Sequence, residues 1–321
     1  MLHALRKYGT LIGVIAVILF FWVMMPDTFM TGRNWLNISQ QVSMLAVVAF
    51  AMTVVMAMGD FDLSVGSMAS LAGIAAALVF KDTGSVPLGL LAALAIGVVG
   101  GLINGALVSF IGILPFVATL GTLTVYSGVA FLLSGGKTIF GSDIPKGFSD
   151  FARGGVPLWQ SGDQMLSLPN LTLVAVASFV IVWVLLEQTV IGRRLYAIGG
   201  NMEAARIAGV KVKSLRFLAF GLSGAGAAAA GLMYASRVAS ANPTQGSGLM
   251  LDAIASVFLG MTMSEEGEPR VTYTLVGVLI LGVLGNGLTQ MNVDSYVREI
   301  LIGSIIILAV ATSSFGKIAG K

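Results

Sequence analysis

Long apolar runs, separated by short polar segments, dominate the chain. A helix needs about 20 mostly apolar residues to cross a bilayer, and ten segments come close to that length. None of them has the residue-by-residue alternation of a membrane β-barrel. The pattern therefore predicts an all-α integral membrane protein of about ten transmembrane helices. The predicted spans are Tyr8–Met25, Gln41–Gly59, Leu63–Phe80, Pro87–Ile111, Pro115–Ser134, Leu171–Glu187, Leu218–Ser236, Leu249–Met263, Val271–Gln290 and Tyr296–Thr312.

Two of these spans need comment. Leu249–Met263 fits the template least well, because it is short and contains Asp252. The first span follows Arg6 and Lys7, as the core of a signal peptide would, but its run of about 18 residues is longer than such a core and no A-x-A site follows it. We therefore interpret it as a retained helix.

Basic residues predict how the spans are oriented. An even number of spans places both termini on one side, and with both termini in the cytoplasm eleven Lys and Arg residues lie inside and seven outside. Six of the eleven lie in the segment Gln188–Arg216, which we expect to be a cytoplasmic loop. The long polar segment Gly135–Asn170 should then lie outside. The other connections are short, so residues 1–321 are predicted to form a single transmembrane domain.

Composition supports lipid as the solvent. Hydrophobic residues make up 56% of the 321 residues and charged residues 10%, whereas a soluble domain carries about 25% charged residues. The 41 glycines fit helices that pack closely in a membrane.

Two stretches of the chain resemble each other. Asp62 opens a short apolar helix and is followed, 42 residues later, by Asn104-Gly105. Asp252 lies in another short helix and is followed, 34 residues later, by Asn286-Gly287. The two stretches belong to spans of opposite direction, which predicts an inverted repeat of five plus five helices. Chance recurrence of Asn-Gly in a glycine-rich chain is the alternative. Asn104, Asp252 and Asn286 are candidate pore residues.

The segment Gly59-Asp60-Phe61-Asp62-Leu63-Ser64-Val65-Gly66-Ser67 places two carboxylates between apolar spans. A carboxylate inside the bilayer costs about 2.5–3.5 kcal/mol on insertion scales. Asp62 could cap the following helix by accepting hydrogen bonds from its free N–H groups, or it could belong to a substrate or proton site. Gly59 and Gly66 permit a tight break and a close backbone approach.

The cytoplasmic loop encodes a short capped helix of about seven residues. Asn201 is a good N-cap, Glu203 falls in the first turn, Ala204, Ala205 and Ala208 favour helix, and Gly209 is a good stop. So short a helix is unstable alone. It must be held by a partner or by the protein's own body. The alternative is a loop at the membrane surface whose arginines contact anionic lipid.

Several kinds of chemistry are excluded. The chain has no cysteine and a single histidine, His3, in its N-terminal tail, so no Cys- or His-based metal site or catalytic triad is predicted. It has no phosphate-binding G-x-x-x-x-G-K-[ST] loop. A net charge of +3 without a long basic run does not indicate nucleic acid. We expect no catalytic, cofactor-binding or metal-binding residues, and hence no enzyme activity on this chain.

Four segments carry a family resemblance. GDFDLSVGS (59–67) resembles the G-x-[IF]-D-L-S-V-G-S signature of ABC-type permeases for ribose, xylose, arabinose and related monosaccharides. LYAIGGNMEAARIAGV (195–210) resembles the cytoplasmic coupling segment of that family, and PFVATLGTL (115–123) and DAIASVFLG (252–260) match two further stretches. The resemblance implies that Gly59, Asp60, Asp62, Ser64 and Gly66 form the signature at a helix break, and that the residues that contact an ATPase are Gly200, Asn201, Glu203, Ala204, Ala205, Arg206 and Gly209.

The resemblance also implies a transport complex of several subunits. Two permease chains would form the pore in a bacterial inner membrane, separate ATP-binding subunits would sit on the cytoplasmic side, and a periplasmic sugar-binding protein would deliver the substrate. One departure is the turn Gly260–Arg270, where the family usually has a glycine-rich turn and this chain has acidic residues. This departure affects the predicted shape of the inner turn.

Two other functions compete with the sugar permease. An ion-coupled secondary transporter could use Asp60, Asp62 or Asp252 for a proton or sodium ion, although such a transporter needs no coupling helix. A permease for branched-chain amino acids would share the fold. The sequence does not specify the sugar, nor whether the pore is a homodimer.

Overall fold

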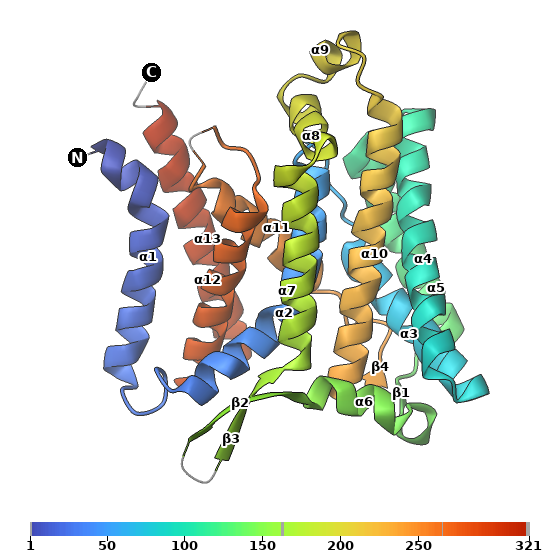
Figure 1. Cartoon of the computed structure of the whole chain (residues 1–321), viewed down its shortest axis with the longest axis vertical. Helices are drawn as coiled ribbons and strands as arrows, with labels where there is room; N and C mark the ends of the chain where they lie inside the picture. Colours follow the sequence, from blue (N-terminus) through green and yellow to red (C-terminus); the bar gives the residue numbers. More distant parts are fainter. Residues whose placement is uncertain (1, 162–163, 265, 319–321) are drawn as a thin grey trace.

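The helices stand side by side, and the connecting segments gather at two opposite ends of the bundle (Figure 1). A computed structural model of the chain describes residues 2–161, 164–264 and 266–318. We call the end that carries the short helix α9 (Met202–Ile207) the α9 face. The opposite end carries the antiparallel pair β2 (Gly155–Ser161) and β3 (Gln164–Pro169), and we call it the hairpin face.

Each predicted span corresponds to one helix. Seven of the described helices are long and apolar enough to cross a membrane by themselves, while α11 is a shorter apolar helix of 13 residues. The prediction of an all-α membrane protein is therefore confirmed. In chain order the spans are α1 (Leu2–Met24), α2 (Gly32–Met56), α3 (Val65–Thr83), α4 (Val86–Ala106) with the π-helical η1 (Leu107–Ile111), α5 (Pro115–Ser134), α7 (Asn170–Trp183) with the π-helical η3 (Val184–Gln188), α10 (Val212–Val238), α11 (Leu249–Met261), α12 (Val271–Gln290) and α13 (Ser295–Ile318).

Polar caps extend some helices beyond the predicted bounds. The α2 helix begins at Gly32 rather than at Gln41, because the Thr31 side chain accepts a hydrogen bond from the Asn34 N–H at 3.2 Å. Asn34 in turn donates its side-chain amide to the Phe29 carbonyl at 2.9 Å. Hydropathy alone missed this first part of the helix, because its residues are polar and lie at the hairpin face.

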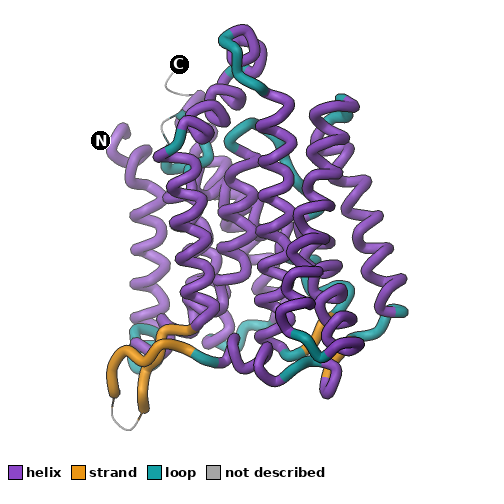
Figure 2. Tube along the Cα trace, turned by 45° about the vertical axis from the view of Figure 1, so that its right-hand side comes forward, coloured by secondary structure: helices purple, strands orange, loops and turns teal. Residues whose placement is uncertain are grey.

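The segment Gly135–Asn170, predicted as a polar loop, contains more structure than expected. Helix α6 (Lys146–Arg153) lies across the end of the bundle, next to the β2–β3 hairpin (Figure 1). Strand β1 (Ile139–Phe140) precedes the 3-10 turn η2 (Gly141–Asp143) and pairs with β4 (Ser240–Ala241). Figure 2 shows the strands only at the hairpin face. The sequence analysis did not predict these small sheets.

The relative sidedness of the chain agrees with the predicted topology. Helix α1 begins and α13 ends at the α9 face, while Gly135–Asn170 lies at the hairpin face (Figure 1). The segment 188–216 contains α8 (Val190–Gly200) and α9. It lies at the same face as the first residues of α1 and the last residues of α13.

Helix packing follows the predicted inverted repeat. In the first half α3 packs on α4, and in the second half α11 packs on α12. Across the halves, α10 packs on α3 and α4, just as α2 packs on α11 and α12. A shift of five spans converts each of these contacts into its counterpart. The two helices that make the cross-contacts, α2 and α10, pack on each other and form the centre of the bundle.

Candidate functional site

A break between α2 and α3 carries the signature residues. The chain leaves α2 at Met56, turns at Gly59 with φ +80°, and re-enters helix at Val65. Irregular backbone at membrane depth requires burial in protein, because lipid offers no hydrogen bonds. Asp60, Asp62 and Ser64 are all buried, and their side chains supply the bonds described below.

Asp60 forms a buried ion pair with Arg216. The Arg216 Nε and Nη2 atoms donate to the two Asp60 carboxylate oxygens, each at 2.7 Å. The two side chains are 5% and 14% exposed, and the geometry is the bidentate one that makes arginine–carboxylate pairs strong. Arg216 lies in the second turn of α10, just after the α9 segment. The pair therefore ties the helix break directly to the cytoplasmic loop predicted for 188–216.

Both carboxylate oxygens of Asp62 accept hydrogen bonds inside the bundle. One carboxylate oxygen accepts from the Ser64 N–H at 3.0 Å and from the Ser64 hydroxyl at 2.6 Å, and the other accepts from the Ser223 hydroxyl at 2.7 Å. The capping hypothesis needs correction: Ser64 occupies the N-cap position of α3, and Asp62 bonds to the N–H just before the helix rather than inside its first turn. Asp62 thus holds the break locally through Ser64 and joins it to α10 through Ser223.

Asn104 continues this polar network. Its side-chain amide donates to the Ser64 hydroxyl at 2.8 Å, and its carbonyl oxygen accepts from the Thr122 hydroxyl at 2.6 Å. Asn104 is completely buried. The candidate pore residue Asn104 thus lies in a network that connects the break with α4 and α5.

Two irregular segments meet in the middle of the bundle. Gly66 is the second residue of α3, and a Cβ atom at this position would lie 2.5 Å from the Gly246 carbonyl oxygen. The Gly246 N–H donates to the Ser70 hydroxyl at 2.9 Å. The segment before α11 is therefore seated against the start of α3, and Gly66 is required there because no side chain fits.

Helix α9 confirms the predicted capped helix. The Asn201 side chain accepts from the Ala204 N–H at 2.9 Å, and Gly209 adopts the left-handed conformation with φ +82° just after the helix. Glu203 and Arg206 form an exposed ion pair at 2.6 Å. Ala205 is buried, whereas Gly200, Ala204 and most of the other coupling candidates are exposed. The helix projects from the bundle (Figure 1), and its Ile207 side chain is exposed.

Helix α8 seats α9 on the bundle. Leu195 and Ile198 are buried against the core. A Cβ atom on Gly199 would overlap the Ala57 carbonyl oxygen, so α8 lies directly against the chain leaving α2. Helix α8 is therefore in direct contact with the chain just before the break at Gly59–Ser64.

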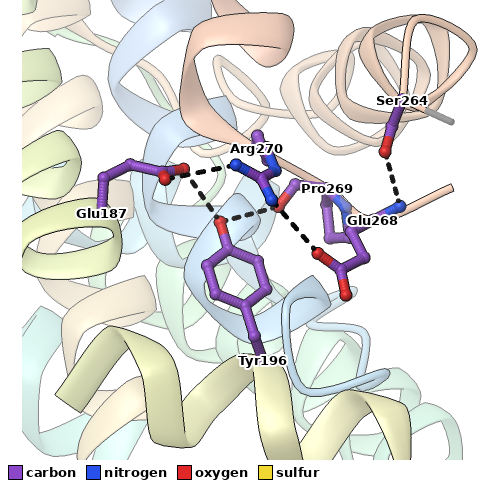
Figure 3. A network of polar contacts seen from close by, with 6 residues as sticks. All are labelled: Glu187, Tyr196, Ser264, Glu268, Pro269 and Arg270. Atoms are coloured by element: carbon purple, nitrogen blue, oxygen red, sulfur yellow. Dashed lines mark hydrogen bonds and ion pairs between the residues drawn. The ribbon is translucent and has the colours of Figure 1, made fainter. Parts of the chain in front are cut away.

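The acidic turn before α12 is tied to α8 (Figure 3). The Tyr196 hydroxyl lies 3.1 Å from the Pro269 carbonyl oxygen and 3.4 Å from a Glu187 carboxylate oxygen, and its single proton is shared between these two acceptors. Arg270 forms ion pairs with Glu187 at 3.5 Å and with Glu268 at 3.7 Å. The turn that departs from the family pattern is thus part of an ordered network. Glu265 of this turn lies outside the described residues.

Burial and charge set the protonation of this network. Burial, followed by the charge of Glu187, raises the pKa of the Tyr196 hydroxyl above its usual value. Burial, followed by the charge of Glu266, raises the pKa of Glu268, and Arg270 opposes this shift.

Asp252 and Asn286, the other two candidate pore residues, come together at one cavity. The cavity has a volume of about 330 Å³ and is bounded by α2, α10, α11, α12 and α13. The structure thus separates the three candidates: Asn104 lies in a closed network, and Asp252 and Asn286 line an open space.

The sequence analysis missed several partners of the signature residues. Arg216, Ser223 and Thr122 were not singled out, although each completes a polar contact of the break. A signal existed for Arg216, since an arginine at the start of an apolar span needs an acidic partner. In the part of the chain that the structure describes, no group of three acidic or histidine side chains could hold a metal ion.

A multi-pass helical bundle with an inverted repeat, broken helices and a projecting short helix defines the permease class of membrane transport proteins. Comparison with known proteins then gives the family. The chain belongs to the branched-chain amino acid transport system / permease component family, whose sequence model matches residues 34–310.

Curated relatives are similar over nearly the whole chain. The ribose import permease protein RbsC of Bacillus subtilis (strain 168) is 38% identical over 95% of this chain and 92% of its own length. The galactose/methyl galactoside import permease protein MglC of Escherichia coli (strain K12) is 35% identical over 96% of this chain and 94% of its own. The L-arabinose transport system permease protein AraH of the same strain is 34% identical over 95% and 89%. No solved structure gave a significant match.

Proposed function

We propose that this chain is the membrane-spanning subunit of an ATP-driven importer that carries a monosaccharide across the bacterial inner membrane by alternating access. The observation that carries the proposal is α9, a capped and exposed helix whose neighbours α8 and α10 are joined to the α2–α3 break by Gly199 and Arg216. An exposed helix that is connected to the helix break in this way suits a transporter driven by a partner protein. The names of the relatives above favour a monosaccharide as the substrate.

The α9 face is cytoplasmic in this proposal. The exposed basic residues Arg193, Arg194, Lys211 and Lys213 flank α9, as the positive-inside rule requires. Cytoplasmic ATP-binding subunits would contact α9 and consume the ATP, so that this chain needs no cofactor. A periplasmic sugar-binding protein would dock on the hairpin face, and a second permease chain would complete the pore.

Force transmission follows from the contacts. When the ATP-binding subunits close, they would displace α9 and with it α8 and the start of α10. The Asp60–Arg216 pair and the Gly199 contact pass this displacement to the break, where helix is already interrupted and motion costs least. The break and the segment at Gly246 that packs against it would then adopt two conformations, and the bound partner would shift the equilibrium between them.

Copurification and reconstitution test this proposal. The tagged chain is purified with the proteins that bind it, reconstituted into proteoliposomes, and assayed for uptake of D-ribose, D-galactose, L-arabinose and L-leucine with and without ATP. The expected result is ATP-dependent uptake of one of the sugars. Uptake of L-leucine alone would establish the amino-acid alternative, and uptake driven by a proton or sodium gradient without ATP would establish the secondary transporter.

A further inference from the structure

Two adjoining cavities open beside the start of α11, in the half of the bundle nearer the hairpin face. Their volumes are about 590 and 330 Å³, and Tyr234, Leu249 and Asp252 line both. These volumes fall within the range of about 300–1,000 Å³ that is usual for sites of small molecules. We call the two together the α11 cavity.

Its walls come from both halves of the repeat. The larger part is formed by the segment between α10 and α11, with Asn242 and Gln245 among its polar residues. The smaller part lies between α2, α12 and α13, where Asn286 and Arg298 contribute. A solute in this space would therefore touch the elements that an alternating-access motion must move.

Several polar groups in the α11 cavity are unused. The Asp252 carboxylate, the Tyr234 hydroxyl, the Arg237 guanidinium and the Gln41 amide make no hydrogen bond or ion pair with the residues described. Polar side chains at membrane depth face the protein interior or water rather than lipid. The α11 cavity is accordingly a wet space whose donors and acceptors are available to a solute.

The lining of the cavity carries charges of both signs. Asp252 is negative and Arg237 and Arg298 are positive, and the exposed Glu299 is a like-charged neighbour of Asp252. Arg298 also donates to the Thr289 hydroxyl at 2.7 Å. Because neutral amides such as Asn242 and Gln245 stand beside these charges, the lining offers both donors and acceptors to a hydroxyl-rich ligand. By contrast, the cavity of about 260 Å³ beneath α6 is walled mainly by apolar residues such as Phe148 and Leu232.

We propose that the α11 cavity is the site at which the permease itself contacts the sugar during transit, an inference that rests on the function proposed above. The Asp252 carboxylate accepts hydrogen bonds from sugar hydroxyls, and the Tyr234 ring covers the less polar face of the sugar. The Asn286 amide donates through its NH2 group, while its oxygen already accepts from the Gln290 side chain at 2.8 Å. A site with few polar groups and one aromatic ring holds its ligand weakly, as release to the other side requires.

A single cysteine can test whether solute passes through this space. Gly285 lines the cavity, and a Cβ atom at this position meets no atom within 4 Å. Gly285→Cys therefore places a thiol in the cavity without a clash, in a chain that has no other cysteine. Gly13→Cys is the matched control, because Gly13 lies on the exposed apolar side of α1 and also has open space for a Cβ atom.

The complex of this chain with its ATPase and binding protein is reconstituted and treated with a negatively charged, impermeant methanethiosulfonate. Uptake is then measured for whichever of D-ribose, D-galactose and L-arabinose the unsubstituted protein carries. We expect Gly285→Cys to be modified and its uptake to fall at least about tenfold, an energy difference of about 1.4 kcal/mol. We expect Gly13→Cys to resist the reagent and to keep its uptake.

Full modification of Gly285→Cys without loss of uptake would overturn the inference, as would equal resistance of both variants to the reagent. The two proposals fail in different ways. If the unsubstituted complex carries none of the three sugars with ATP, the proposed function fails. If it carries one and modified Gly285→Cys still carries it, only the site is wrong.

A second measurement does not depend on the cysteine variant. Asp252→Leu removes the acceptor, whereas Asp252→Asn removes only the charge, so for a neutral ligand we expect Asp252→Leu to lose at least about tenfold in sugar carried per ATP hydrolysed and Asp252→Asn to lose less. Hydrolysis stimulated by the loaded binding protein should persist in both variants. Equal loss in both variants would indicate a site for an ion, and wild-type uptake in both would show that Asp252 does not contact the sugar.

Discussion

At the residue scale, the buried side chains around the helix break combine structural and mechanical roles. Asp60 and Asp62 lie two residues apart and bind different positions on one helix: Asp60 pairs with Arg216 at the α9 end of α10, and Asp62 accepts from Ser223 further along the same helix. Both carboxylates therefore fasten the break to α10. Substitutions at the two positions should separate their contributions.

Asp60→Ala should strongly destabilise the protein. It leaves the Arg216 guanidinium, which is only 14% exposed, without its partner, and removal of one member of a buried pair costs about 3–5 kcal/mol. Thermal unfolding of the detergent-purified protein measures this effect. The exposed Glu203–Arg206 pair provides the control, since Glu203→Ala should change stability by less than about 1 kcal/mol. Similar unfolding temperatures for Asp60→Ala and the unsubstituted protein would contradict the structural role of the pair.

Asp62→Asn should be milder than Asp62→Leu. Asparagine keeps a carbonyl oxygen that can accept from Ser64 or Ser223, whereas leucine leaves these buried donors unpaired at about 1–3 kcal/mol each. The amount of folded protein and the uptake rate of the two variants are the readouts. Complete loss of transport in both variants, with normal folding, would instead assign Asp62 an ionic role in transport.

At the scale of elements, the helical structure of α9 is determined almost entirely by local sequence, whereas its position on the bundle depends on α8. The helix has six residues, far too few to be stable alone, and it is held at one end by α8 and at the other by the start of α10. Changes in α9 should therefore disturb the contact with a partner without unfolding the bundle.

Glu203→Lys and Gly209→Pro should uncouple transport from ATP hydrolysis. Glu203→Lys removes the bond to Arg206 and places a positive charge at the positive end of the helix, an effect of about 0.3–1 kcal/mol. Proline cannot adopt the positive φ of Gly209. We expect normal amounts of protein in the membrane, poor sugar uptake, and ATP hydrolysis that the loaded binding protein no longer stimulates. Unchanged uptake in both variants would remove the coupling role from α9.

At the scale of the whole molecule, the inverted repeat has diverged between its halves. In the first half, Ser64, Asn104 and Thr122 close into a buried network. In the second half, the corresponding region around Asp252 and Asn286 is an open cavity. The two halves thus differ in how their polar residues are used: in the first half they bond to one another, and in the second half they line a cavity.

Cysteine labelling should show that the hairpin face is periplasmic. Ser149 lies in the segment predicted to be outside but is buried, so the exposed Ser142 is the better position, with Ser214 as its counterpart at the α9 face. In cells with a permeabilised outer membrane, an impermeant thiol reagent should modify Ser142→Cys and spare Ser214→Cys. The reverse pattern would invert the topology and place α9 outside.

The sequence by itself determined the spans, the relative sidedness and α9. Each of these is a local property: an apolar run is long enough to cross lipid or it is not, and the caps of α9 lie within three residues of the groups that they satisfy. The helix break was visible for the same reason, because two carboxylates and two glycines in nine residues cannot continue an apolar helix. What the sequence could not determine is where those carboxylates point.

Only the tertiary structure decided the partners. Asp60 and Arg216 are 156 residues apart in the chain, and Asp62 and Ser223 are 161 apart. The sequence offered several basic residues and many hydroxyls as alternatives. The same holds for Asn104 and Asn286, which look equivalent in the sequence: the first is closed off by Ser64 and Thr122, and the second faces a cavity. The packing of helices distant in sequence determines such contacts, because it alone decides which polar side chains are brought within hydrogen-bond distance in the interior of the bundle.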